Sequence, residues 1–231
     1  MSDDLNPFAS PEGFDNAGFD PASQDDAWTR ENPAAMRKVR TGLTLVYFGI
    51  CGMVLSVLAM ALGGIAGILA IMYPGIVVLV ISTIAVFVGE CFCMAAPAES
   101  GARFLAQITV GIQVLNFVMS FVVEQIDLPF QVEVGLNWIL GLANLAATIC
   151  FVLFLRTMAL YIARPDIAKQ AMMSLVVGVV SGVCFIVIAV LSVALQMEPL
   201  GTLFIPVLIG FLVSFVMFAN SVNNLRKAIT V

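Results

Sequence analysis

The chain alternates between long apolar runs and short polar breaks over most of its length. Between Arg40 and Glu90 there are 49 consecutive uncharged residues, and one helix needs about 20 apolar residues to cross a bilayer. This run therefore predicts two membrane-spanning helices. We place the break between them at Tyr73–Gly75, because proline and glycine favour turns. Four further apolar stretches are each long enough for one span, and Glu198–Pro199 separates the last two.

This pattern predicts an all-α fold, a polytopic transmembrane bundle of six spans arranged as three hairpins. Pro97 and Pro165 are expected to end the second and fourth spans, because proline disrupts a helix interior. A basic segment, 33–41, precedes the transmembrane domain, 42–224, and a short basic C-terminus, 225–231, follows it. The six spans are expected near residues 42–72, 76–96, 102–123, 136–163, 168–195 and 202–224.

Composition supports a membrane protein. Of the 231 residues, 61% are apolar and 11% are charged, whereas soluble domains have about 45–50% and about 25%. The charge is also uneven, because residues 1–31 contain eight of the fifteen acidic residues and one of the ten basic ones. Segment 1–32 has no apolar periodicity, so we predict a disordered acidic tail. A secretory signal would instead start with basic residues.

The basic residues predict how the spans are oriented. With six spans, all ten basic residues lie on or near the side of the N-terminal tail. The charged residues of the opposite loops are all acidic. Basic loops stay in the cytoplasm, so we expect both termini to be cytoplasmic. The tail would then be available to a cytoplasmic protein partner.

Small residues recur along the first and fifth spans. In the first span their spacing alternates between three and four residues, which keeps one face toward a neighbouring helix. Small side chains let helices approach closely in lipid. These faces predict either tight packing inside the bundle or a contact with a second copy of the chain. They comprise Gly49, Gly52, Ser56, Ala59, Gly63, Ala66 and Ala70 in the first span, and Ser174, Gly178 and Gly182 in the fifth.

Polar residues form a stripe on the third span and another on the fourth. They are Thr109, Gln113, Asn116 and Ser120 on the third, and Asn137, Gly141, Asn144 and Thr148 on the fourth. Because unsatisfied amides are costly in lipid, the stripes should face protein or water. Aligning the antiparallel spans by depth pairs Asn116 with Asn144. Two interpretations stay open, a seam of interhelical hydrogen bonds and the lining of a path for a polar solute.

Two charged residues lie within the expected spans. Glu90 and Arg156 are each roughly 10 Å from the tail-side boundary, at ~1.5 Å per residue. Matching depths predict an intramembrane charge pair. Snorkelling to the interface and a functional ion or proton site are the alternatives.

No enzyme signature is present in the sequence. The H-E-x-x-H, G-x-S-x-G, P-loop and dinucleotide motifs are all missing, and the chain contains no histidine. The five cysteines all lie in apolar runs and do not form the paired clusters of a metal site. We therefore expect no catalytic residues, no cofactor and no metal. Without a basic stripe, nucleic-acid binding is not expected either.

Three stretches resemble a known group of proteins. They are the tail start Asn6–Pro11, which reads N-P-F-A-S-P, and the turn regions Cys91–Arg103 and Phe154–Ala168. Together they resemble uncharacterised multi-span inner-membrane proteins of planctomycete bacteria, whose tails often read N-P-Y-x-S-P. Phe8 replaces the tyrosine of that motif. The resemblance implies a bacterial inner membrane and brings no established activity.

The sequence therefore predicts an integral membrane protein that contacts the lipid bilayer and acts as a non-enzymatic structural or interaction protein. The alternative is a small transporter or channel for a polar solute or ion. Its path would follow the polar stripes of the third and fourth spans.

Overall fold

The computed structural model describes residues 32–126, 129–194 and 201–229. Within these residues the predicted all-α fold is confirmed, and six helices are long and apolar enough to cross a membrane. The chain is therefore a multi-pass membrane protein. Its helices are α3 (Pro33–Ala66), α4 (Leu69–Cys93), α5 (Ala102–Gln125), α6 (Phe130–Tyr161), α7 (Pro165–Ala194) and α8 (Gly201–Ala228), with a short 3-10 helix η1 (Ala98–Ser100) before α5. The predicted tail up to residue 31 and the break at Glu198–Pro199 lie outside the described residues.

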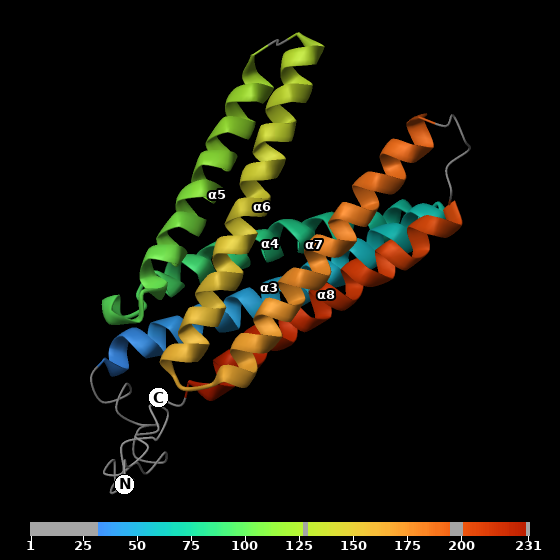
Figure 1. The fold of residues 1–231 in the computed structure, drawn as a ribbon. Helices are drawn as coiled ribbons and strands as arrows, with labels where there is room; N and C mark the ends of the chain where they lie inside the picture. The colour runs from blue at the N-terminus through green and yellow to red at the C-terminus, as the bar shows by residue number, and fades with distance from the viewer. Residues whose placement is uncertain (1–31, 127–128, 195–200, 230–231) are drawn as a thin grey trace, which may run out of the picture.

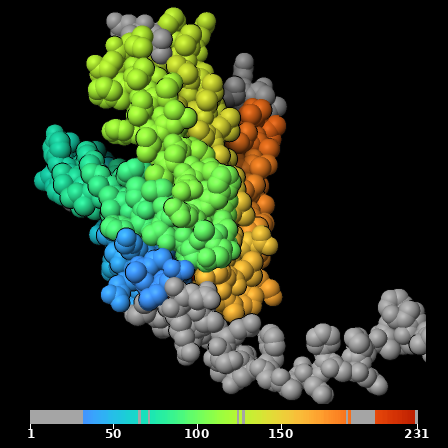
Figure 2. All heavy atoms as spheres, turned by 90° about the vertical axis from the view of Figure 1, so that its left-hand side faces the viewer, coloured from blue at the N-terminus to red at the C-terminus, as the bar shows by residue number. Residues whose placement is uncertain are grey.

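Consecutive helices pair as three antiparallel hairpins. The most extensive contacts join α3 with α4, α5 with α6, and α7 with α8. Figure 1 shows that the hairpins meet at one end of the molecule, and that the α5/α6 hairpin diverges from the α3/α4 hairpin toward the other end. Figure 2 shows the same divergence from the side. We call the end where the hairpins meet the base, and both α3 begins and α8 ends there.

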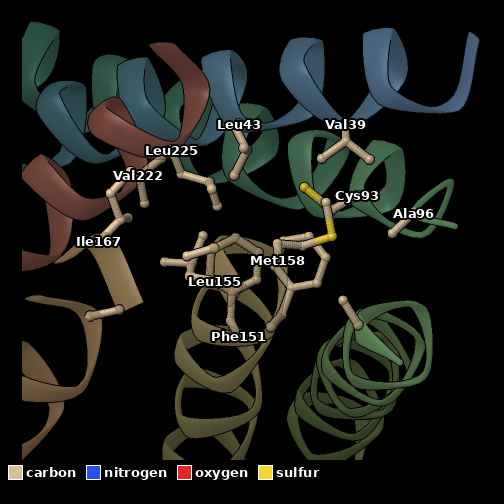
Figure 3. Packing of buried hydrophobic residues seen from close by; sticks show 14 of the residues in the cluster. Val39, Leu43, Cys93, Ala96, Phe151, Leu155, Met158, Ile167, Val222 and Leu225 are labelled. Atoms are coloured by element: carbon tan, nitrogen blue, oxygen red, sulfur yellow. The ribbon is translucent and has the colours of Figure 1, made fainter. Parts of the chain in front are cut away.

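The hydrophobic core lies at the base. Its buried side chains come from the first turns of α3, α5 and α7 and from the last turns of α4, α6 and α8. In Figure 3, Val39 and Leu43 of α3 lie above Leu155 and Met158 of α6, with Leu225 of α8 beside them. Each such contact contributes little by itself, but a buried side chain makes dozens of them. The base is therefore where the three hairpins are held together.

The halves of the helices farther from the base are much less covered. Val183 of α7 is 55% exposed and Leu212 of α8 is 54% exposed. Apolar side chains lose little by facing lipid, because lipid tails are as apolar as they are. This part of each hairpin is suited to direct contact with the bilayer.

The first turn lies earlier in the chain than the sequence predicts. The break expected at Tyr73–Gly75 is wrong, because α3 ends at Ala66 and Pro74 lies inside α4. Gly67 adopts a left-handed φ of 67°, and the N–H of the next residue donates to the carbonyl oxygen of Gly63 at 2.8 Å. Glycine adopts this φ without steric cost and so closes the helix here. The first two helices therefore occupy 33–66 and 69–93 instead of 42–72 and 76–96.

The two proline turns at the base agree with the sequence. Pro97 directly precedes η1 after α4 has ended, and Pro165 is the first residue of α7. The basic segments predicted at 33–41 and 225–231 are largely helical, since α3 begins at Pro33 and α8 continues to Ala228. These turns and helix ends bring the basic residues of the described chain to the base.

Candidate functional site

The small residues of α3 pack against α4 inside the chain. A methyl group at Gly49 would lie 2.6 Å from Cγ2 of Val86, and one at Gly52 would overlap the hydroxyl group of Ser82. Gly63 is equally close to α4, and Ser56 is buried. The sequence left two interpretations open, packing inside the bundle and contact with a second copy. At Gly49, Gly52 and Gly63 the structure shows packing inside the bundle.

The small residues of α7 pack against α8 in the same way. A methyl group at Gly178 would lie 2.8 Å from Oγ of Ser214, and one at Gly182 would lie 3.9 Å from the Phe211 ring. Ser214 also donates a hydrogen bond to the carbonyl oxygen of Ser174 at 2.7 Å. Gly178 therefore lies at a close approach of the two helices, whereas a methyl group at Gly182 would make an ordinary van der Waals contact.

The polar stripe of α5 changes its surroundings along the helix. Thr109, nearest the base, is fully buried, and its hydroxyl group lies 2.9 Å from the carbonyl oxygen of Leu105 and 3.4 Å from that of Ala147 on α6. Gln113 and Asn116 are half-buried, and Ser120 is exposed. Only the base end of this stripe contacts α6 through a hydrogen bond within the described residues.

The polar stripe of α6 does not face α5. Asn137, Gly141, Asn144 and Thr148 are all exposed, and we call these four residues the polar face of α6. The hydroxyl group of Thr148 donates to the carbonyl oxygen of Asn144 in its own helix at 3.0 Å. The pairing of Asn116 with Asn144 is therefore wrong.

The reason is the rotation of α6 about its own axis. Ala147 is fully buried where Thr109 meets it, so the small residue at position 147 faces α5. Successive residues on a helix are separated by ~100°. Asn144 and Thr148 lie ~60° and ~100° around the helix from Ala147, so they flank the contact with α5 instead of facing it, although their depths match those of the α5 stripe.

A shallow hollow lies along the polar face of α6. It has a volume of about 410 Å³ and is lined by Val134, Asn137, Trp138, Gly141 and Leu142. A methyl group at Gly141 would meet no atom of the chain within 4 Å. The hollow exists because glycine leaves the helix backbone uncovered between larger exposed side chains.

Glu90 on α4 is the most unusual polar group in the described part of the chain. It is only 4% exposed, and the Gln113 side chain of α5 is its hydrogen-bonding neighbour. Its second carboxyl oxygen, Oε2, has no hydrogen-bond partner, and neither has the buried Oδ1 of Asn116. Buried polar atoms are nearly always paired, and ionisable residues within spans are candidates for a functional site.

The predicted charge pair is not formed. Arg156 is exposed on α6, while Glu90 is buried next to α5. Within the described residues the two side chains form no ion pair, and Oε2 of Glu90 stays without a partner. Leu155 and Met158, the neighbours of Arg156 on its helix, occupy the packed side of α6, so Arg156 faces outward. Gln113 is the contact of Glu90 that depth alone did not reveal.

Basic side chains gather at the base. Arg226 of α8 lies over the Tyr47 ring of α3 at 5.1 Å and donates a hydrogen bond to Asn223 at 2.8 Å, and a cation over an aromatic ring is favourable. The basic residues of the described helices and turns are Arg37, Lys38, Arg40, Arg103, Arg156, Arg164, Lys169, Arg226 and Lys227. All belong to helix ends or turns at the base or, for Arg156, to the last two turns of α6.

Two kinds of polar group therefore distinguish this bundle, the buried Glu90 with Gln113 and the exposed polar face of α6. Within the described residues no cluster of three or more His, Cys, Asp or Glu side chains could bind a metal ion, and the cysteines there are free thiols. The chain matches no protein-family model, no curated protein and no solved structure.

Proposed function

We propose that this multi-pass membrane protein is a non-enzymatic structural or interaction protein, and that it binds another transmembrane helix through the polar face of α6. The observation that carries the proposal is the exposure of Asn137, Asn144 and Thr148 within the stretch 134–155 of α6, which is otherwise apolar. A side-chain amide that faces lipid loses its hydrogen bonds to water and gains none in return. Another helix can supply those hydrogen bonds.

The packing of the remaining helices supports this choice of face. Four glycines of α3 and Gly178 of α7 already pack closely against α4 and α8, so these close-packing faces are occupied within the chain. The polar face of α6 combines exposed hydrogen-bonding groups with an open glycine. It is therefore the surface of the described helices best suited to a specific helix partner.

Photo-crosslinking in native membranes tests the proposal. A benzoylphenylalanine at Leu145, which is 51% exposed beside the polar face, should form a crosslink to a polypeptide. The matched control is the same group at Ile186 of α7. This residue is 57% exposed, and its neighbours in the sequence are apolar. Crosslinking to lipid alone at both positions would contradict the proposal.

We further propose that the base faces the cytoplasm of a bacterial cell, so that both termini are cytoplasmic and the acidic tail can meet a protein partner there. The basic residues at the base support this orientation, because such residues are retained on the cytoplasmic side. The inner-membrane location rests on the resemblance of the tail and the two turn regions to bacterial membrane proteins.

Cysteine labelling in intact cells tests the orientation. In a cysteine-free background, Phe130→Cys, at the far end of α6 and 78% exposed in the native chain, should react with a membrane-impermeant maleimide. Ala98→Cys, at the base turn, should react only after the membrane is opened. The reverse pattern would show that the base faces outward.

A second candidate function is transport of a proton or small cation, and the unpartnered Oε2 of Glu90 specifically favours it. A carboxyl group with a free oxygen in a span can bind a proton or a cation, and Gln113 would orient it. The test is ion flux in proteoliposomes, where wild type should conduct and Glu90→Gln should not. Glu99→Gln, an exposed base-turn control, should leave flux unchanged. No wild-type flux across a panel of monovalent cations and protons would rule out this candidate.

A further inference from the structure

We propose that the helix bound by the polar face of α6 is α6 of a second copy of the same chain, so that the protein is a parallel, two-fold symmetric dimer. This inference rests on the function proposed above and names the partner. It follows from the spacing of the polar face, the chemistry of its side chains and the hollow at Gly141.

The spacing of the face suits close packing against a second helix. Its four residues are separated by four, three and four positions along α6, an average of about 3.7 residues, close to the 3.6 residues of one helical turn. Such a spacing keeps one face toward a partner helix over the three turns that the polar face occupies. The face ends at Thr148, because Phe151 and Val152 enter the core of the base.

Membrane topology makes the two α6 helices parallel. Every copy of the chain inserts in the same orientation, so a two-fold axis normal to the membrane places each residue of α6 opposite its own counterpart. Asn144 then meets Asn144 of the second copy at the same depth. An amide group has both a donor and an acceptor, so two identical asparagines can satisfy each other.

The charges along the face are compatible with this pairing. The four residues of the polar face are uncharged, so no like charges meet within the membrane. Glu133 continues the face one turn beyond Asn137, in the first turn of α6. It is exposed and close to the aqueous end of the helix, where water and salt screen the repulsion between two carboxylates.

The hollow at Gly141 provides room for close approach. The absence of any atom within 4 Å of a methyl group there leaves the backbone accessible to the second copy. Trp138 and Leu142, which are 68% and 63% exposed, both line the hollow. They would pack across the dimer interface around the hydrogen-bonded centre.

Helix α7 offers no equivalent partner for Asn144 within the described residues. On the outer half of α7, the exposed side chains Val179, Val183 and Ile186 are apolar. Ser181 of the same helix is buried close to Gly210 of α8. If the outer half of α7 packed against the polar face of α6, it would therefore cover the asparagine amides of that face without giving them hydrogen bonds.

Disulfide crosslinking of the full chain in its native membrane tests the dimer. In a cysteine-free background, Asn144→Cys should give a covalent dimer under mild oxidation. Ala146→Cys is the matched control, because it is also exposed but lies ~200° around the helix and should give none. Equal yields at the two positions, or no dimer at either, would overturn the proposal.

A glycine substitution in the otherwise native chain tests the same interface without new cysteines. A Cβ atom at position 141 meets no atom of the chain within 4 Å, so the fold should tolerate Gly141→Leu, yet this change should weaken dimerisation by roughly tenfold or more by filling the hollow. Gly111→Leu on α5 is equally open and should leave dimerisation unchanged. The readout is energy transfer between labelled copies as they are diluted in lipid. An unchanged dimer in Gly141→Leu would refute the proposed interface.

Failure of this inference can be distinguished from failure of the proposed function. If the crosslinker at Leu145 captures a different polypeptide and Asn144→Cys gives no dimer, the partner is another protein and the dimer is refuted, while the proposed function stands. If the crosslinker captures lipid only, both are refuted.

Discussion

Ala163 shows how one residue determines the geometry of a whole turn. It has a positive φ of 57°, and it is the only non-glycine residue of the described chain to do so. The N–H of Arg164 donates to the carbonyl oxygen of Ala159 at 2.8 Å and closes α6, and Pro165 then begins α7. A side chain in this conformation is strained by roughly 1 kcal/mol, whereas glycine is not.

Replacing this alanine should stabilise the protein. We expect Ala163→Gly to raise the free energy of unfolding by about 0.5–1 kcal/mol, because the strain at a left-handed position is removed. The measurement is unfolding in detergent followed by circular dichroism. Ala61→Gly, an exposed position inside α3, should instead lower stability by a similar amount. A loss of stability in Ala163→Gly would show that the positive φ is not a source of strain.

Helix pairs depend on glycine at the points of closest approach. In the α3/α4 hairpin, a methyl group at Gly89 would lie 2.6 Å from the carbonyl oxygen of Gly42, and one at Gly42 would overlap the carbonyl oxygen of Gly89. Backbone atoms cannot move aside as a flexible side chain can. The two glycines therefore set the distance between these helices next to Glu90.

Gly42→Ala should be markedly destabilising. We expect a loss of about 1–3 kcal/mol, because the added methyl group forces the two backbones apart. Gly64→Ala is the matched control on the same helix, where a methyl group meets nothing within 4 Å, and it should be neutral or stabilising by up to about 1 kcal/mol. Unfolding in detergent compares the two variants. Equal effects would mean that the close approach does not limit packing.

At the scale of the whole molecule, packing is concentrated at the base. Leu155 of α6 is fully buried there, whereas Leu212 on the outer part of α8 is 54% exposed. The α5/α6 hairpin diverges from the α3/α4 hairpin beyond the base, as Figure 1 shows. Cohesion of the bundle should therefore come mainly from its base, while the outer parts are free to contact lipid or another helix.

Two leucine truncations test this distribution. Leu155→Ala should cost about 2–5 kcal/mol, since it leaves a cavity in a packed region. Leu212→Ala should change stability by less than about 0.5 kcal/mol, since lipid replaces the lost contacts. Denaturation from mixed micelles gives both values. Similar losses for the two variants would contradict a core confined to the base.

The sequence by itself determined the number of spans, their pairing as hairpins and the side on which the basic residues lie. These properties depend on length, apolar content and charge, which can be counted along the chain. The proline turns before η1 and at the start of α7 were predictable for the same reason. The first turn was not, because a left-handed glycine at position 67 closes α3 while a helix accommodates Pro74.

Only the tertiary structure decided which way each helix faces. Depth increases by ~1.5 Å per residue whatever surrounds the helix, so the sequence placed Glu90 level with Arg156 and Asn116 level with Asn144. Rotation about the helix axis depends instead on which side chains pack most closely. Ala147 turned toward Thr109, which left Asn144 exposed. Gln113, on the neighbouring helix, became the contact of Glu90, because packing between helices selects neighbours that depth cannot specify.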